Sequence, residues 1–218
     1  MAILLIFVKL GRAKPVTVGK EGNKYLDLLS PVPLSEMAHP EKGKALLNEK
    51  IVPEQEALRE VATTLLQAKN PVIFVPGRIL LWGWGEGAYE KAEALRVLAA
   101  EVGAEILPVM DVRPEYPKMR TATEINPYHV DLVIGHNKYD VAVFMGVECS
   151  YADVALKIIR DGTGCYTVAL CGHLGHVDAS ATFCHMGRDQ IAELAAVVAA
   201  VKQEMQTDQQ AEKNTTLI

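Results

Sequence analysis

The chain has 218 residues, a net charge of −5 at pH 7 and 50% hydrophobic residues. This length fits one ordinary domain with an extension, and the composition permits a packed core and excludes global disorder. The pI is about 5.7, and the sequence shows no basic stripe, which excludes nucleic acid as an expected partner.

Residues 1–52 are predicted to form a strand followed by an extended arm. Met1–Val8 is apolar, but it lacks a basic region before it and a small-residue cleavage site after it, so it is more typical of a strand than of a signal peptide. No run approaches the roughly 18 apolar residues of a membrane helix, so we expect a cytoplasmic chain without membrane contact. One short helix is expected near Glu41–Asn48. The apolar side chains around Tyr25–Leu29 indicate that the arm packs on a neighbour, such as a partner chain.

Residues 53–206 carry strands that alternate with helices, a pattern typical of a parallel sheet with helices on both faces. Pro53 suits the first turn of a helix, which is predicted to end near Asn70. Strands are expected in the apolar runs 71–75, 105–109, 139–145, 166–170 and 181–183. Further helices are expected at 88–102, 151–160 and 190–205, with Gly103 as the C-cap of the first.

Because parallel strands are covered on both faces, their side chains should be buried on both. The expected buried residues are Val72, Phe74, Val141, Val143, Val168 and Leu170. Residues 111–138 contain three prolines and are expected to form a long loop with a short helix at 121–125 and an apolar patch at 130–134. The polar tail, 207–218, is expected to be flexible and frayed.

The segment 70–87 joins an apolar strand to a helix through a glycine-rich loop with two tryptophans. In open α/β sheets such loops form a ligand crevice at the carboxyl ends of the strands, and the helix N-terminus suits a phosphate. The candidate cofactor-binding residues here are Gly77, Trp82, Gly83, Trp84 and Gly85. Two alternatives remain: the tryptophans form an apolar patch for a partner chain, or the loop is only a tight turn. Glu86 would repel a phosphate close to its side chain.

Two further segments follow strands and should reach the same edge of the sheet. The first supplies Gly146, Cys149 and Ser150 as candidate cofactor-binding residues. Ser150 is preferred as the N-cap of the helix 151–160, and the Cys149 thiol would have a lowered pKa there if it were exposed. We assign no catalytic residue, because no base lies near Cys149 in the sequence.

The second segment, CGHLGH at 171–176, supplies Gly172 and His173 as candidate cofactor-binding residues. Histidine and cysteine are ligand types for zinc or iron, but this spacing matches no standard site. A metal site, a ligand-lining loop and a purely structural loop remain open; plain structure is preferred, and no metal ligand is assigned. The cysteines, Cys149, Cys165, Cys171 and Cys184, are expected to be reduced thiols.

Several phrases of the sequence together resemble one known family. They are AKNPVIFV at 68–75, the glycine turn at Gly77, YDVAVFMG at 139–146 and ASATF at 179–183. They resemble the epsilon subunit of the archaeal-type carbon monoxide dehydrogenase/acetyl-CoA synthase complex, also called acetyl-CoA decarbonylase/synthase, over residues 54–204. The longer arm, the two tryptophans and the His/Cys-rich stretch 171–185 depart from the family pattern and indicate a divergent member.

The resemblance implies a Rossmann-like open parallel sheet of the DHS-like NAD/FAD-binding type, to which the N-terminal arm is added. It implies a non-catalytic accessory subunit for assembly or electron transfer in anaerobic one-carbon and acetyl-CoA metabolism. The implied partner is a large metal-cluster catalytic subunit in a hetero- or homo-oligomer, and FAD is the suspected cofactor. The alternative is a flavin- or nucleotide-binding protein, or a detached domain like the middle domain of thiamine-diphosphate enzymes.

Overall fold

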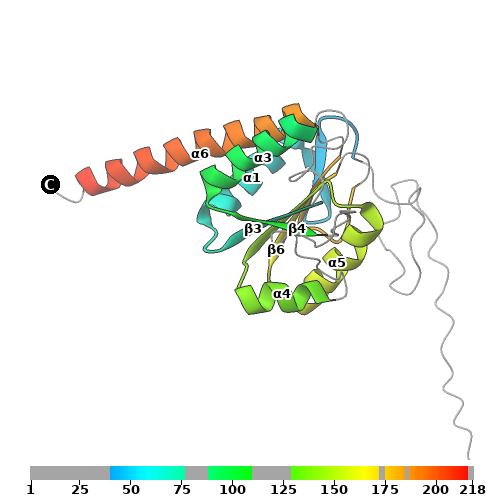
Figure 1. Ribbon diagram of the computed structural model, residues 1–218. Coiled ribbons are helices and arrows are strands. Elements are labelled where there is room, and N and C mark those ends of the chain that lie inside the picture. The colour runs from blue at the N-terminus through cyan, green and yellow to red at the C-terminus, as the bar shows by residue number, and fades with distance from the viewer. Residues whose placement is uncertain (1–39, 77–87, 110–128, 172–174, 185–186, 216–218) are drawn as a thin grey trace, which may run out of the picture.

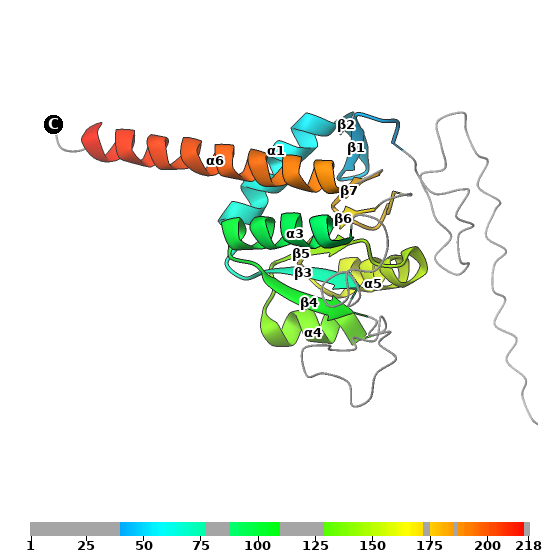
Figure 2. The ribbon, with the colours of Figure 1, turned by 45° about the horizontal axis from the view of Figure 1, so that its top comes forward.

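The described part of the chain forms three layers, with a sheet between two layers of helices (Figure 1). The computed structural model describes residues 40–76, 88–109, 129–171, 175–184 and 187–215. Within these residues the sheet has seven strands in the order β2-β1-β7-β6-β5-β3-β4, an order that Figure 2 shows from one edge to the other. The strands are β1 Lys44–Leu47, β2 Lys50–Pro53, β3 Pro71–Pro76, β4 Glu105–Val109, β5 Val141–Met145, β6 Tyr166–Leu170 and β7 Ala181–Phe183.

Strands β3 to β7 pair in parallel, whereas β1 pairs antiparallel with both β2 and β7. One face of the sheet is covered by α1 Glu54–Gln67, α3 Ala88–Val102 and α6 Arg188–Thr215. The other face is covered by α4 Val130–Asn137 and α5 Cys149–Gly162. This arrangement confirms the predicted α/β class, an open and mostly parallel sheet with helices on both faces.

Each face of the sheet has its own hydrophobic core, because successive side chains of a strand point to opposite faces. Val143 packs with the core under α1, α3 and α6, and its neighbour Phe144 packs with the core under α4 and α5. The strand residues expected to be buried are all buried: Val72, Phe74, Val141, Val143, Val168 and Leu170. Strands β4, β6 and β7 and helix α3 have the predicted bounds, and Gly103 has the positive φ (69°) of a helix C-cap.

The region of the predicted short helix at 41–48 is instead a β-hairpin. Strands β1 and β2 are joined by Asn48 and Glu49, whose φ angles are 47° and 65°. Two consecutive positive φ values are typical of a type I′ turn, the turn that matches the twist of paired strands. The hairpin extends the sheet beyond β7 through the pairs Leu46–Thr182 and Leu47–Ala181. The helix prediction was therefore wrong, and the rest of the predicted arm, 1–39, lies outside the described residues.

A second difference is helix α4, which replaces most of the predicted loop at 130–138. Val130 and Ile134 are one turn apart and both buried, so the apolar patch there is one face of a helix. Lys138 ends this helix in the left-handed region, with φ 57°. The predicted short helix at 121–125 lies outside the described residues.

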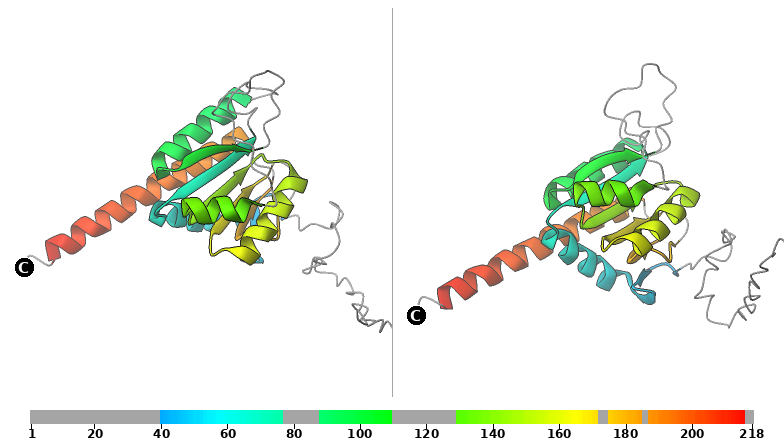
Figure 3. Two further views of the ribbon diagram at one scale, coloured as in Figure 1. Left: turned by 60° about the horizontal axis from the view of Figure 1, so that its bottom comes forward. Right: turned by 90° about the horizontal axis from the view of Figure 1, so that it is seen from below.

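Helix α6 is longer than the predicted 190–205, since it continues to Thr215. Among its described side chains, the buried ones lie in the first half, at Ile191, Leu194, Ala195, Val198 and Val201. Figure 3 shows the second half extending past the sheet and the other helices. Among the described residues, no helix combines the length and the apolar character needed to cross a membrane.

Candidate Cys/His site

The described part of the candidate site lies at the carboxyl ends of β5 and β6, which are neighbours in the sheet. Gly146 follows β5 with a positive φ of 62° and donates its N–H to the carbonyl of Leu170 at 3.2 Å. Cys171 follows β6 directly and donates its N–H to the carbonyl of Phe183 at 3.0 Å. The predicted juxtaposition of the 146–150 and 171–176 segments is therefore present for their described residues.

The other sequence-assigned residues of this crevice lie outside the described residues. They are Gly77, Trp82, Gly83, Trp84, Gly85, Gly172 and His173. Their assignment to a cofactor, like that of Gly146, Cys149 and Ser150, stays a prediction.

The N-terminus of α5 is capped by Glu148 rather than by Ser150. The Glu148 carboxylate accepts hydrogen bonds from the backbone N–H groups of Ser150 (3.3 Å) and Tyr151 (3.2 Å) and from the Ser150 hydroxyl. The hydrogen bond from the Ser150 side chain, with the two N–H groups, lowers the pKa of Glu148 against the opposing effect of partial burial. The prediction of Ser150 as the N-cap was therefore wrong, because the helix begins two residues earlier than predicted. A carboxylate already occupies the N–H groups to which a phosphate at this helix start would bind.

Two thiols and an imidazole come together beside this cap, and we call Cys149, Cys171 and His176 the Cys/His cluster. Their potential ligand atoms all lie within 4.8 Å of one another. The sulfur atoms of Cys149 and Cys171 are 3.6 Å apart, and all four cysteines of the chain are free thiols. Cys171 and His176 are buried, with exposed fractions of 6% and 2%, whereas Cys149 is partly exposed. Solvent can therefore reach the cluster through Cys149, whereas Cys171 and His176 are enclosed by protein.

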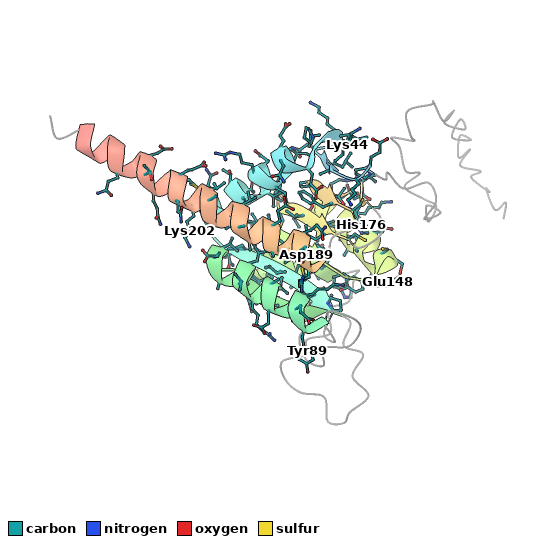
Figure 4. The ribbon with its side chains drawn as sticks, turned by 90° about the horizontal axis from the view of Figure 1, so that it is seen from above. Lys44, Tyr89, Glu148, His176, Asp189 and Lys202 are labelled. Atoms are coloured by element: carbon teal, nitrogen blue, oxygen red, sulfur yellow. The ribbon has the colours of Figure 1, made fainter. Side chains whose placement is uncertain are left out.

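His176 is held in a fixed orientation by three contacts. Its Nδ1 lies 2.6 Å from a carboxylate oxygen of Asp153 on α5, and its backbone N–H donates to the Thr182 hydroxyl at 3.0 Å. The ring also forms a hydrogen bond with the Cys171 side chain. Burial acts to lower the pKa of His176, but the bonds to Asp153 and Cys171 outweigh it and raise the pKa to about 9. Figure 4 shows His176 and Glu148 towards the end of the domain where α6 begins, near Asp189, and away from Lys202.

The thiol of Cys149 does not have the lowered pKa expected for an exposed cysteine at a helix start. Burial, the Cys171 thiol and the acidic groups of Asp153 and Glu148 raise its pKa to about 12. The positive end of the helix dipole does not offset these effects, because the Glu148 carboxylate already accepts hydrogen bonds from N–H groups at the helix start. As a protein thiol without a bound cation, Cys149 is a weak nucleophile at neutral pH.

A comparison with family models bears on the whole of this region. The model described as "CO dehydrogenase beta subunit/acetyl-CoA synthase epsilon subunit" matches residues 34–198. The chain belongs to this family. No curated protein matches the sequence.

The family match covers the β1–β2 hairpin, the entire sheet and the Cys/His cluster. It confirms the family assigned from the sequence phrases, and it begins earlier than the resemblance over 54–204 because the hairpin belongs to the same domain. The match ends within the docked half of α6, so the projecting half lies beyond the part that defines the family.

Sequence reasoning missed Asp153. It placed the segment 171–176 in the same crevice as 146–150, but it assigned Gly172 and His173 there rather than Cys171 and His176. One signal was available, since Cys149 and Asp153 are four residues apart and therefore share a face of α5. The rest of the cluster depends on which strands are neighbours, and Cys149 is 22 residues from Cys171 along the chain.

Proposed function

We propose that this chain is a non-catalytic accessory subunit of a CO dehydrogenase/acetyl-CoA synthase-type complex in one-carbon metabolism, acting in assembly or electron transfer. The observation that carries the proposal is the family match, whose description names subunits of these two enzymes. Apart from Val201, the match spans the buried residues of both hydrophobic cores, as expected of a subunit that folds as a unit and docks on a larger partner.

Exposed apolar side chains on α3 support a docking role. Tyr89 and Val97 are 69% and 54% exposed on the outer side of this helix, and Figure 4 shows Tyr89 pointing away from the ribbon. The segment with Trp82 and Trp84 leads directly into α3, so four large apolar residues are close in sequence. Tyrosine and tryptophan are enriched at the centres of protein interfaces. We propose that the metal-cluster catalytic subunit contacts the chain here.

The test mixes the purified full-length chain with the purified catalytic subunit of the same organism and measures mass by light scattering after size exclusion. We expect one joint peak with a defined stoichiometry. Replacing both tryptophans, Trp82→Ala with Trp84→Ala, should weaken association by about 2 kcal/mol, which is roughly 30-fold in the dissociation constant. Leu132→Ala is the matched control, because Leu132 is 65% exposed on α4, on the opposite face of the sheet. Separate elution of the two wild-type proteins at micromolar concentration would overturn the proposal.

The two roles, assembly and electron transfer, differ in what the chain changes. If it transfers electrons, adding it should raise the rate at which CO oxidation reduces a low-potential acceptor dye while the mass of the complex stays that of the joint peak. If it serves assembly, the dye-reduction rate per catalytic subunit stays constant and the thermal stability of the catalytic subunit rises. A flavin spectrum in the joint peak would favour electron transfer.

FAD at the crevice remains the proposed cofactor, and Glu148 supplies its test. A diphosphate bound at the start of α5 must displace the Glu148 carboxylate, which caps Ser150 and Tyr151. Glu148→Ala should therefore tighten FAD binding several-fold if the diphosphate lies there, in a titration followed by the flavin fluorescence. Equal affinity of wild type and variant would place the diphosphate away from α5.

A further inference from the structure

We propose that Cys149, Cys171 and His176 bind one divalent transition-metal ion of the zinc class, with Asp153 orienting the histidine. The inference stands on the geometry of the Cys/His cluster and does not depend on the proposed function. It assigns metal ligands where the sequence pattern assigned none.

The spacing of the ligand atoms fits a tetrahedral ion. With zinc–sulfur bonds of about 2.3 Å, two thiolates of a tetrahedral site lie about 3.8 Å apart. The Cys149 and Cys171 sulfurs are 3.6 Å apart, and the histidine nitrogen lies within 4.8 Å of them. A disulfide requires a separation of about 2 Å, so the observed distance suits two thiolates that share one ion.

The histidine is already arranged as metal-binding histidines are. Such a residue donates one ring N–H to a carboxylate, which fixes the tautomer and leaves the other nitrogen for the metal. Here Nδ1 of His176 contacts Asp153 at 2.6 Å, so Nε2 is the nitrogen for a ligand, and a bound ion would replace the hydrogen bond between the ring and the Cys171 side chain. His176 is buried and Asp153 is 35% exposed. The pair therefore resembles a carboxylate–histidine–metal arrangement, with the position of the metal between the ring and the two sulfurs.

The backbone around each ligand is fixed by the sheet. The backbone N–H of Cys171 donates a hydrogen bond to the carbonyl of Phe183 at the end of β7. The backbone N–H of His176 donates one to the hydroxyl of Thr182 in the same strand. Cys149 begins α5, whose first turn is held by the Glu148 cap. Ligands on rigid elements lose little conformational freedom when an ion binds, which favours high affinity.

The charges of the cluster also favour a divalent cation. Two thiolates and a neutral imidazole carry a charge of −2, which one divalent ion neutralises in this largely buried position. Sulfur and imidazole ligands select zinc-class ions over magnesium or calcium, which prefer oxygen. The described residues supply three of the four positions of a tetrahedral site, the number found where the fourth is held by water or an exogenous ligand.

The test uses the full-length chain, purified under reducing and oxygen-free conditions and freed of metal by a chelator. Titration with Co²⁺ should give a thiolate-to-cobalt charge-transfer band and the visible bands of tetrahedral cobalt, saturating at one equivalent per chain. One equivalent of Zn²⁺ should remove these bands. Separate measurement of the free thiols should show that a bound ion protects two of the four cysteines from alkylation.

Variants identify the ligands. Cys149→Ser and Cys171→Ser should lose the saturable site, and Asp153→Asn should weaken Zn²⁺ binding by about 10- to 100-fold, because Asp153 acts through His176. Cys165→Ser is the matched control, since Cys165 is a partly buried cysteine at the opposite end of β6. Circular dichroism checks folding, and Cys149 and Asp153 are the decisive positions because their side chains are not fully buried.

Three outcomes would overturn the proposal. They are the absence of a saturable cobalt site in the folded wild type, wild-type metal affinity in folded Cys149→Ser, and a Cys149–Cys171 disulfide that persists when Zn²⁺ is added under reducing conditions. Because the isolated chain is tested, failure here leaves the association experiment unaffected, and failure of association leaves this result unaffected.

Discussion

At the scale of single residues, two variants can test whether Glu148 or Ser150 caps the start of α5. Glu148→Ala removes the acceptor for two backbone N–H groups and should lower the free energy of unfolding by about 1 kcal/mol. Ser150→Ala removes only a donor to that carboxylate and should cost less. Urea unfolding of both variants measures the difference. A larger loss in Ser150→Ala would show that the serine is the cap.

Asp140 gives a prediction about pH. Partial burial acts to raise the pKa of its carboxyl, but the backbone N–H groups of Lys69, Asn70, Asp140 and Val141 outweigh it, so the pKa lies below its ordinary value. The bonds from Lys69 and Asn70 are 2.7 and 2.9 Å long and tie the end of α1 to the start of β5.

A lowered folded-state pKa means that the ionised carboxylate stabilises the fold above the unfolded pKa of about 4 and that this contribution is lost as the pH falls below it. Asp140→Asn should therefore be less stable than wild type at pH 7, and the difference should shrink as the pH falls through and below 4. Unfolding by urea across this pH range measures it. A difference that grows on acidification would contradict the assignment.

At the scale of elements, two helix ends can be compared because both adopt the left-handed conformation. Gly103 ends α3 with φ 69°, and a Cβ there would meet no atom within 4 Å, so Gly103→Ala should cost about 1 kcal/mol through backbone conformation alone. Lys138 ends α4 with φ 57°, so Lys138→Gly should stabilise the protein by about 0.5 to 1 kcal/mol. Thermal unfolding of both variants checks these opposite signs, and shifts of the same sign would refute them.

The same two elements show how far sequence reasoning reaches. Helix α3 was predictable because its buried residues recur at helical spacing and a glycine ends it. Helix α4 was not, because VDLVI at 130–134 also suits a strand and its ending residue is a lysine rather than a glycine. The β1–β2 hairpin was not predicted for a similar reason, since Asn48-Glu49 lacks the glycine that usually marks a type I′ turn.

For the candidate site, the sequence gives the edge of the sheet but not the contacts. The strand ends after β5 and β6 could be placed together because consecutive parallel strands with crossovers are usually neighbours. Which side chains meet there depends on the start of α5, which the Glu148 cap sets, and on the direction of the His176 ring, whose Nδ1 contacts Asp153, 23 residues earlier in the chain.

At the scale of the whole molecule, the sheet separates the two cores, and β5 is an interior strand between β3 and β6. Val143 is fully buried and is paired with Ile73 on one side and Val168 on the other. Val143→Asp places an unpaired charge in the core and should lower the stability by about 3 kcal/mol or more. Val97→Asp is the control, because Val97 is 54% exposed. Normal thermal stability of Val143→Asp would refute the assignment of β5.

Helix α6 has 28 residues, about 42 Å at 1.5 Å per residue, but the last buried one among its described side chains is Val201. Beyond Met205 the described side chains Gln206, Thr207, Asp208 and Gln210 are exposed. An isolated helix as short as this projecting part would be marginal in water, because the first turn of a helix is costly to nucleate. Here the docked turns supply that nucleus, so each later turn only propagates from the one before. The rate of amide hydrogen exchange should therefore increase steadily from Val201 towards Thr215, as it does in a helix that frays from one end.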